Sequence, residues 1–163
     1  MVTIDKAQLV ETILEQLQKA YQGALEAADR AHSTATDDEN APENQYDTLA
    51  LEAAYLAHGQ SQRVAECMAD LTAYRKLQTA LPAGTEQIVL GCMVHLVDED
   101  DNEKCVFFGP TAGGIKLTVA DQEIVVVTPT SPLGDALLGL EEGDEVEVPL
   151  GHHTAYYDVA AIY

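Results

Sequence analysis

Tryptophan is absent from this chain of 163 residues, cysteine occurs only three times, and only eight side chains are basic. None of Cys67, Cys92 and Cys105 forms a Cys-x-x-Cys pair, so we expect buried, reduced thiols and a cytoplasmic protein. No apolar run approaches the roughly 20 residues that a membrane-spanning helix needs. The first residues also lack the basic and apolar regions of a signal peptide, and we therefore expect no membrane association.

The shortage of basic residues also limits the partners. With 28 acidic residues against eight basic ones, the formal net charge is -20. Proteins that bind free DNA or RNA neutralise phosphates with lysine and arginine, so this balance argues against free nucleic acid as a partner. It favours basic partners, typically other proteins.

The composition changes near residues 81–84 (Leu-Pro-Ala-Gly). Residues before this point are rich in alanine, leucine, glutamine and glutamate, whereas β-branched runs separated by glycine and proline follow it. We therefore predict an α+β chain with a helical domain over residues 1–80 and a β-rich domain over residues 81–163.

The helical domain is predicted to be an antiparallel hairpin, or coiled coil, of two long helices. The first spans about residues 5–32 and the second about 43–79, and the acidic segment 34–44 forms the tip. A helix of this length reaches about 42 Å. The predicted buried positions are Leu9, Ile13, Leu17, Ala20, Ala24 and Ala28 in the first helix, and Leu49, Leu56, Val64, Cys67, Met68, Leu71 and Leu77 in the second.

The β-rich domain is predicted to hold six strands, near residues 87–97, 104–108, 115–119, 123–128, 145–148 and 155–162. Ser131 and Pro132 are typical of the cap and first turn of a helix, so a short helix is expected over residues 132–138. The predicted core comprises Ile88, Leu90, Val106, Leu117, Val125, Val127, Leu137 and Leu138.

No phosphate-binding loop, dinucleotide-binding glycine motif or nucleophile elbow occurs in the sequence. Two acidic clusters remain. The first, residues 98–101, is interpreted as a solvated hairpin turn. The second lies at the predicted tip and comprises Asp37, Asp38, Glu39 and Glu43. It is either a solvated connection or a set of oxygen ligands for a divalent cation, and the residues alone leave both interpretations open.

Residues 127–148 resemble the C-terminal signature of the GreA/GreB transcription elongation factors. They contain a Ser-Pro opening at Ser131, an Ala-Leu-Leu-Gly helix ending at Gly139, and a Gly-Asp turn at Gly143. The resemblance implies an FKBP-like β domain that docks on bacterial RNA polymerase at the rim of its secondary channel. The docking residues that it implies are Ser131, Pro132, Leu133 and Gly134.

Residues 43–46 (Glu-Asn-Gln-Tyr) resemble the start of the second hairpin helix in the same family. The resemblance implies that the hairpin enters the secondary channel, where an Asp and a Glu three residues later help to hold Mg²⁺ in the polymerase active centre. Glu43 matches the second acid, but Asn40 stands at the position of the first. Asp38 or Glu39, with Asp37 beside them, are the candidates to replace it as catalytic and metal-holding acids.

The resemblance therefore predicts an accessory factor, not an enzyme, which stimulates the polymerase to cleave nascent RNA in backtracked complexes. Nascent RNA is met only within the polymerase complex. Two alternatives stay open. Asn40 favours a regulator that occupies the channel without stimulating cleavage, and the net charge allows an acidic protein-interaction module unrelated to polymerase.

Overall fold

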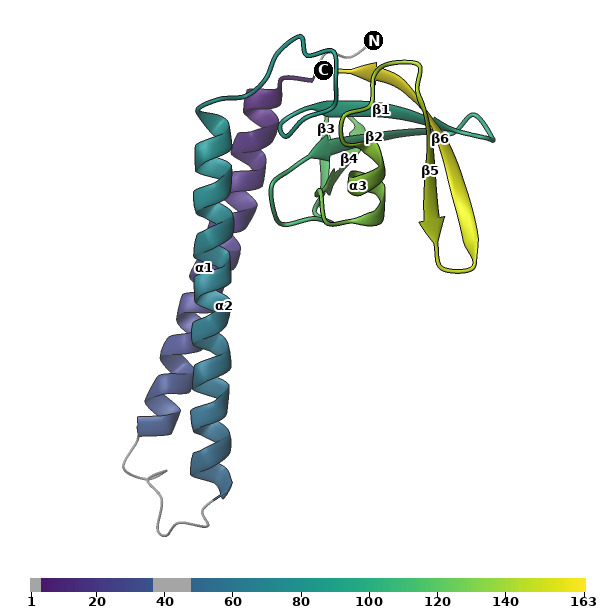
Figure 1. Ribbon diagram of the computed structural model, residues 1–163. Coiled ribbons are helices and arrows are strands. Elements are labelled where there is room, and N and C mark those ends of the chain that lie inside the picture. The colour runs from purple at the N-terminus through teal and green to yellow at the C-terminus, as the bar shows by residue number, and fades with distance from the viewer. Residues whose placement is uncertain (1–3, 37–47) are drawn as a thin grey trace. The chain divides into compact units, whose positions relative to one another are not determined.

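The computed structural model describes residues 4–36 and 48–163. Two long helices, α1 (Lys6–Thr36) and α2 (Thr48–Gln78), precede a mixed six-stranded sheet and one short helix, α3 (Pro132–Leu137) (Figure 1). This confirms the predicted order of a helical hairpin followed by a β-rich half. The strands are β1 (Met93–Asp98), β2 (Glu103–Phe108), β3 (Lys116–Val119), β4 (Gln122–Val127), β5 (Glu145–Leu150) and β6 (His153–Ile162). No described helix is long and apolar enough to cross a membrane.

Contacts within the chain define two compact units. The first unit joins Met1–Ile13 to Ala73–Tyr163, and the second unit is the intervening segment Leu14–Thr72. The first turns of α1 and the last turns of α2 thus belong with the sheet. The second unit is an insertion between them.

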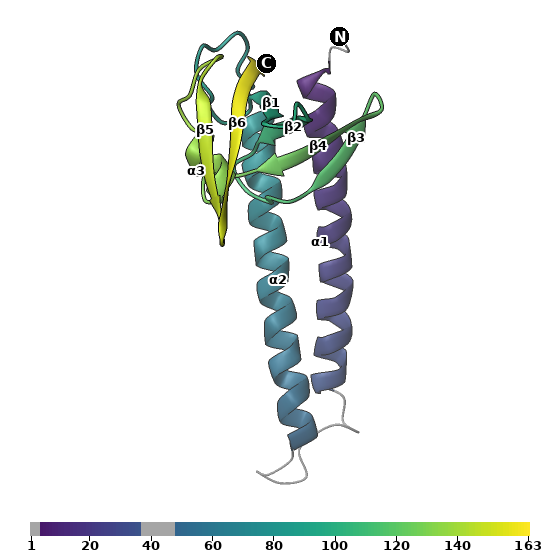
Figure 2. The same cartoon turned by 90° about the vertical axis from the view of Figure 1, so that its right-hand side faces the viewer.

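In the second unit, the described parts of α1 and α2 run antiparallel and side by side (Figure 2). The positions of α2 that face inward recur at alternating steps of three and four residues, which is the heptad spacing of a coiled coil. Most of them are small or polar, and so the two helices can approach closely. They are Ala50, Ala53, Ala57, Gln60, Val64, Cys67 and Leu71, of which Ala50, Ala57, Cys67 and Leu71 are buried.

Three predicted positions of the hairpin interface are wrong. Leu56 is 59% exposed, Met68 is 39% exposed, and Ala20 is also exposed, whereas Ala57 and Cys67 are buried. The heptad phase selects Ala57 and Gln60 rather than Leu56, because only one stripe of each helix can face its partner. The larger leucine and methionine side chains therefore lie outside the interface.

The sheet of the first unit has the strand order β3-β4-β2-β1-β6-β5. All neighbouring strands are antiparallel except β2 and β4, which are parallel. Helix α3 packs against one face of the sheet (Figure 1). The core on this side consists mainly of aliphatic strand residues and includes Ile88, Val94, Leu96, Val106, Phe108, Val127, Leu137, Val146, Val148 and Val159.

The ends of the long helices are anchored to the β half within the same unit. Tyr74 of α2 is fully buried, and its hydroxyl donates a hydrogen bond of 2.8 Å to the carbonyl of Thr111. A Cβ atom placed on Gly109 would lie 2.2 Å from this hydroxyl oxygen and 2.9 Å from Cγ1 of Val126, so only glycine fits there. The Lys6 ammonium of α1 also donates a hydrogen bond to the carbonyl of Pro82.

The first predicted strand begins later than expected, at Met93 instead of residue 87. Gly91 has φ of +92°, and a Cβ atom there would lie 2.5 Å from Cδ of Pro82, so the chain turns before the strand starts. Two predicted core residues are wrong. Leu90, in the turn before β1, is 39% exposed, and Leu138, at the end of α3, is 51% exposed. Val125 is half-buried, whereas Ile88, Val106, Leu117, Val127 and Leu137 are buried as predicted.

Candidate functional site

The best-defined candidate site is the turn that leads from β4 into α3. Ser131 caps α3 from an extended conformation, with φ of -79° and ψ of 153°. Its Oγ accepts a hydrogen bond of 3.0 Å from the backbone N–H of Gly134 and donates one of 2.8 Å to the carbonyl of Thr128. Pro132 follows in the first turn, where the absence of an N–H group costs nothing. The Ser-Pro pair therefore begins the helix as predicted.

Close packing against Thr128 holds this turn in one shape. A Cβ atom on Gly134 would lie only 1.8 Å from the carbonyl oxygen of Thr128, so no other residue fits without a backbone shift. The side-chain oxygens of Thr128 and Thr130 are 3.0 Å apart and share a hydrogen bond. The turn is thus preorganised, which reduces the ordering cost of binding a partner.

The four predicted docking residues differ in their exposure. Pro132 is exposed, Ser131 and Leu133 are half-buried, and Gly134 is buried. Leu133 packs against the core beneath α3, so it anchors the turn. Gly134 allows the close approach to Thr128. Of the four, Pro132 is the residue best placed to contact a partner.

The surface of the turn extends beyond the predicted residues. Pro132 and Asp135 of α3 and Leu138, which directly follows the helix, recur every third residue, and all three are exposed. Leu138, which was predicted from the sequence to lie in the core, is 51% exposed. The helical periodicity of residues 132–138 could have predicted that Leu138 is exposed. Adjacent residues of a helix point in different directions, and Leu137 occupies the inward position.

The hydroxyl of Ser131 is committed to the fold rather than to chemistry. Both of its hydrogen bonds go to backbone groups, and neither partner is a base that could accept its proton. The arrangement therefore suits recognition of a partner surface and does not form an activated nucleophile.

The predicted tip acids, Asp37, Asp38, Glu39 and Glu43, lie outside the described residues, as does Asn40. Within the described ranges, no group of three or more histidine, cysteine, aspartate or glutamate side chains could hold a metal ion. The predicted Mg²⁺ ligands therefore stay a prediction from the sequence.

Comparison with known proteins identifies the C-terminal half. Residues 83–163 match the family described as "Transcription elongation factor, GreA/GreB, C-term". The matched range contains the whole sheet, α3 and the Ser131–Gly134 turn. No curated protein matches the chain.

Several solved structures are similar to the chain at low identity. Gfh1 of Thermus aquaticus is 24% identical, with 99% of this chain and 97% of that chain covered and a TM-score of 0.40. The GreA factor homolog Gfh1 of Thermus thermophilus is 19% identical, with coverages of 96% and 94% and a TM-score of 0.38. A GreA/GreB elongation factor from Nitrosomonas europaea is 17% identical, with coverages of 63% and 90% and a TM-score of 0.37.

Proposed function

The chain belongs to the GreA/GreB family of transcription elongation factors by its C-terminal domain, and from this premise we propose that it binds bacterial RNA polymerase and acts on elongation. The observation that carries the proposal is the family match over residues 83–163, which includes the preorganised Ser131–Gly134 turn. In this proposal the β half docks at the rim of the secondary channel. The protein then works in the cytoplasm, where bacterial polymerase is found.

The proposed docking surface is the outer side of α3 with its preceding turn. Pro132 and Leu138 supply exposed apolar contacts, and Asp135 supplies a negative charge between them. An apolar anchor flanked by polar groups is the usual composition of an interface centre. Ser131 and Gly134 support this surface from beneath.

The helical hairpin is proposed to enter the channel with its acidic tip first. Glu43, together with Asp38 or Glu39, would then supply carboxylate oxygens to the Mg²⁺ of the polymerase, which is a hard cation that prefers oxygen ligands. The polymerase performs the RNA cleavage, and this chain serves as an accessory factor that supplies ligands and orientation. Nascent RNA is contacted only within that complex.

A second candidate function is supported by one residue of the tip. Asn40 stands three residues before Glu43, where the family pattern has an aspartate, and an amide carries no charge to offer a cation. A factor with this tip would occupy the secondary channel and change pausing without accelerating cleavage.

The deciding experiment uses a purified bacterial polymerase stalled in a backtracked complex. For a cleavage factor, we expect faster release of short 3′ RNA fragments with the wild-type chain, loss of this effect in Glu43→Ala, and retained binding of that variant. Leu138→Ala should weaken binding and cleavage together, whereas Leu150→Ala, which removes another exposed leucine, should change neither.

The outcomes separate the candidates. Binding without any acceleration at any Mg²⁺ concentration supports the channel-occupying regulator. Full cleavage by Glu43→Ala refutes the role of Glu43, and failure of the wild-type chain to bind polymerase refutes both proposals.

A further inference from the structure

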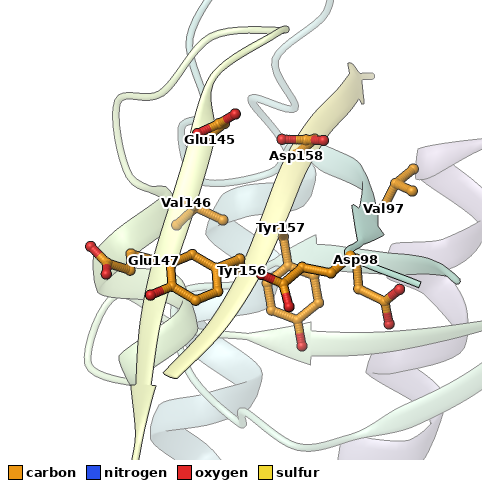
Figure 3. A pocket seen from close by; sticks show the side chains of 9 residues that line it. Val97, Asp98, Glu145, Val146, Glu147, Tyr156, Tyr157 and Asp158 are labelled. Carbon is orange, nitrogen blue, oxygen red and sulfur yellow. The ribbon is translucent and has the colours of Figure 1, made fainter. Parts of the chain in front are cut away.

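A hollow of about 400 Å³ lies on the outer face of the sheet, formed by β5, β6 and the end of β1 (Figure 3). Along β5 and β6 the side chains of Val146, Tyr157 and Val159 lie on the side of the core that α3 covers, so the alternating side chains project from the opposite face. These outward side chains are Glu145, Glu147, Tyr156 and Asp158. Five of the nine lining residues are acidic and none is basic. The lining comprises Val97, Asp98, Glu99, Glu145, Val146, Glu147, Tyr156, Tyr157 and Asp158.

Two carboxylates in the hollow occupy an unfavourable arrangement. Glu145 of β5 and Asp158 of β6 are directly opposite each other in the antiparallel register, and both project from the outer face (Figure 3). Like charges at such positions destabilise a sheet. The free chain thus keeps a repulsion that a bound cation would relieve, and this observation points to a positively charged ligand.

An aromatic ring completes the hollow. Tyr156 is 45% exposed and lies opposite Glu147, to which its hydroxyl donates a hydrogen bond (Figure 3). This hydrogen bond, together with the negative charges of Glu147 and Glu99, raises the pKa of Tyr156, so the ring stays neutral. The neighbouring Tyr157 already has Lys104 Nζ at 5.8 Å from its ring centroid, whereas Tyr156 faces the acidic hollow.

The spacing of the carboxylates favours an extended cation over a metal ion. Although five acids line the hollow, the described part of the chain contains no group of three or more ligands close enough to hold one ion. Asp98 is also occupied, because it accepts hydrogen bonds from Asp100 N and from the backbone and side chain of Asn102. The charges left for a ligand are spread across two strands.

We propose that this hollow binds an arginine side chain presented by a partner protein. A guanidinium group is planar, stacks on an aromatic ring and offers five donors, so it can lie on Tyr156 while pairing with Glu145, Glu147 or Asp158. A lysine ammonium is a compact charge and cannot meet these separated groups at once. The hollow is separate from the Ser131–Gly134 turn, and the proposal does not depend on polymerase being the partner.

The test titrates the full ¹⁵N-labelled chain with a capped Gly-Arg-Gly-Arg-Gly peptide and with its lysine counterpart, both at low and at physiological salt. We expect amide shift changes concentrated in residues 97–99, 145–147 and 156–158, and binding of the arginine peptide at least threefold tighter than of the lysine peptide. Glu145→Gln combined with Glu147→Gln should weaken binding at least fivefold, and Tyr156→Leu at least threefold.

The control removes the same charge elsewhere. Glu11→Gln combined with Glu86→Gln changes two exposed acids outside the hollow and should weaken binding less than twofold. Equal weakening by both double variants, or shift changes spread over the whole acidic surface, would overturn the proposal in favour of diffuse attraction. Equal affinity for the two peptides, an unaffected Tyr156→Leu variant, or no binding by the wild-type chain would overturn it as well. Unchanged spectra of the core amides verify that each variant is folded.

Discussion

The contact between Tyr74 and Gly109 predicts that two destabilising substitutions will partly cancel. In Gly109→Ala the new methyl group would lie 2.2 Å from the Tyr74 hydroxyl oxygen and 2.9 Å from Val126 Cγ1. Overpacking of this kind costs about 1–3 kcal/mol, and we take about 2 kcal/mol. Tyr74→Phe removes the hydrogen bond to the Thr111 carbonyl, which costs about 1 kcal/mol.

The double variant tests the shape of the contact. Removing the hydroxyl ends the 2.2 Å contact but leaves the new methyl group 3.2 Å from the ring carbon Cζ and 2.9 Å from Val126 Cγ1, so only part of the overpacking is relieved. The combined loss should therefore be about 2 kcal/mol instead of the additive value of about 3 kcal/mol, a coupling of about 1 kcal/mol.

Urea unfolding of the four proteins of this cycle measures the coupling. Gly113→Ala serves as the matched control, because its Cβ would contact only the side chain of Thr128, at 3.1 Å, and its effect should add to that of Tyr74→Phe. Additivity within about 0.4 kcal/mol for the Gly109 pair would refute the view that this hydroxyl occupies the space that a methyl group needs.

Three further predictions concern single sites. Ser131→Ala should lower the free energy of unfolding by about 1 kcal/mol through loss of the α3 cap, as measured in urea; an unchanged midpoint would contradict the capping geometry. Hydrogen bonds from Asn102 lower the pKa of Asp98 below 3.8, so the stability that this carboxylate contributes is present above pH 3.8 and is lost as the pH falls through the lowered pKa. Asp98→Asn should therefore lower the melting temperature at pH 7 and leave it unchanged near pH 1–2; an equal loss at both would disprove the linkage. Glu145→Gln should raise stability by about 0.2–1 kcal/mol at low salt, and the gain should shrink in about 1 M salt, whereas a salt-independent change would exclude charge repulsion as its cause.

The features that the sequence predicted well depend on local chemistry. The Ser131–Gly134 turn follows from a capping serine, a first-turn proline and a glycine three residues after the serine, and all of these act within one helical turn. The strands β2 to β4 were predicted to within one residue because short β-branched runs are bounded there by turn residues.

The interface of the hairpin could not be predicted in the same way. Its inward positions include Ala53, Ala57 and Gln60, which carry little hydrophobic signal, whereas the larger Leu56 and Met68 are exposed. Periodicity alone leaves several stripes of such a helix nearly equivalent, and the partner helix decides between them.

Long-range pairing explains the other omissions. The opposition of Glu145 and Asp158 depends on the register of β5 with β6, and a shift of one residue would send these side chains to the other face. The alternating acids of residues 145–147 were a visible signal of an exposed strand face. The tyrosine that lies opposite Glu147 became evident only from the pairing.

The second unit, Leu14–Thr72, interrupts the first unit in the sequence. The length of the two helices within the second unit can therefore change without altering the residues of the first unit. Seven residues added to each helix at matching positions would lengthen each by about 10.5 Å and turn the inward stripe by only about 20°. Leu9, Ile13 and Tyr74 would keep their places in the first unit. Paired insertions or deletions of whole heptads could thus change the length of the second unit during evolution while the sheet and the α3 surface keep their structure.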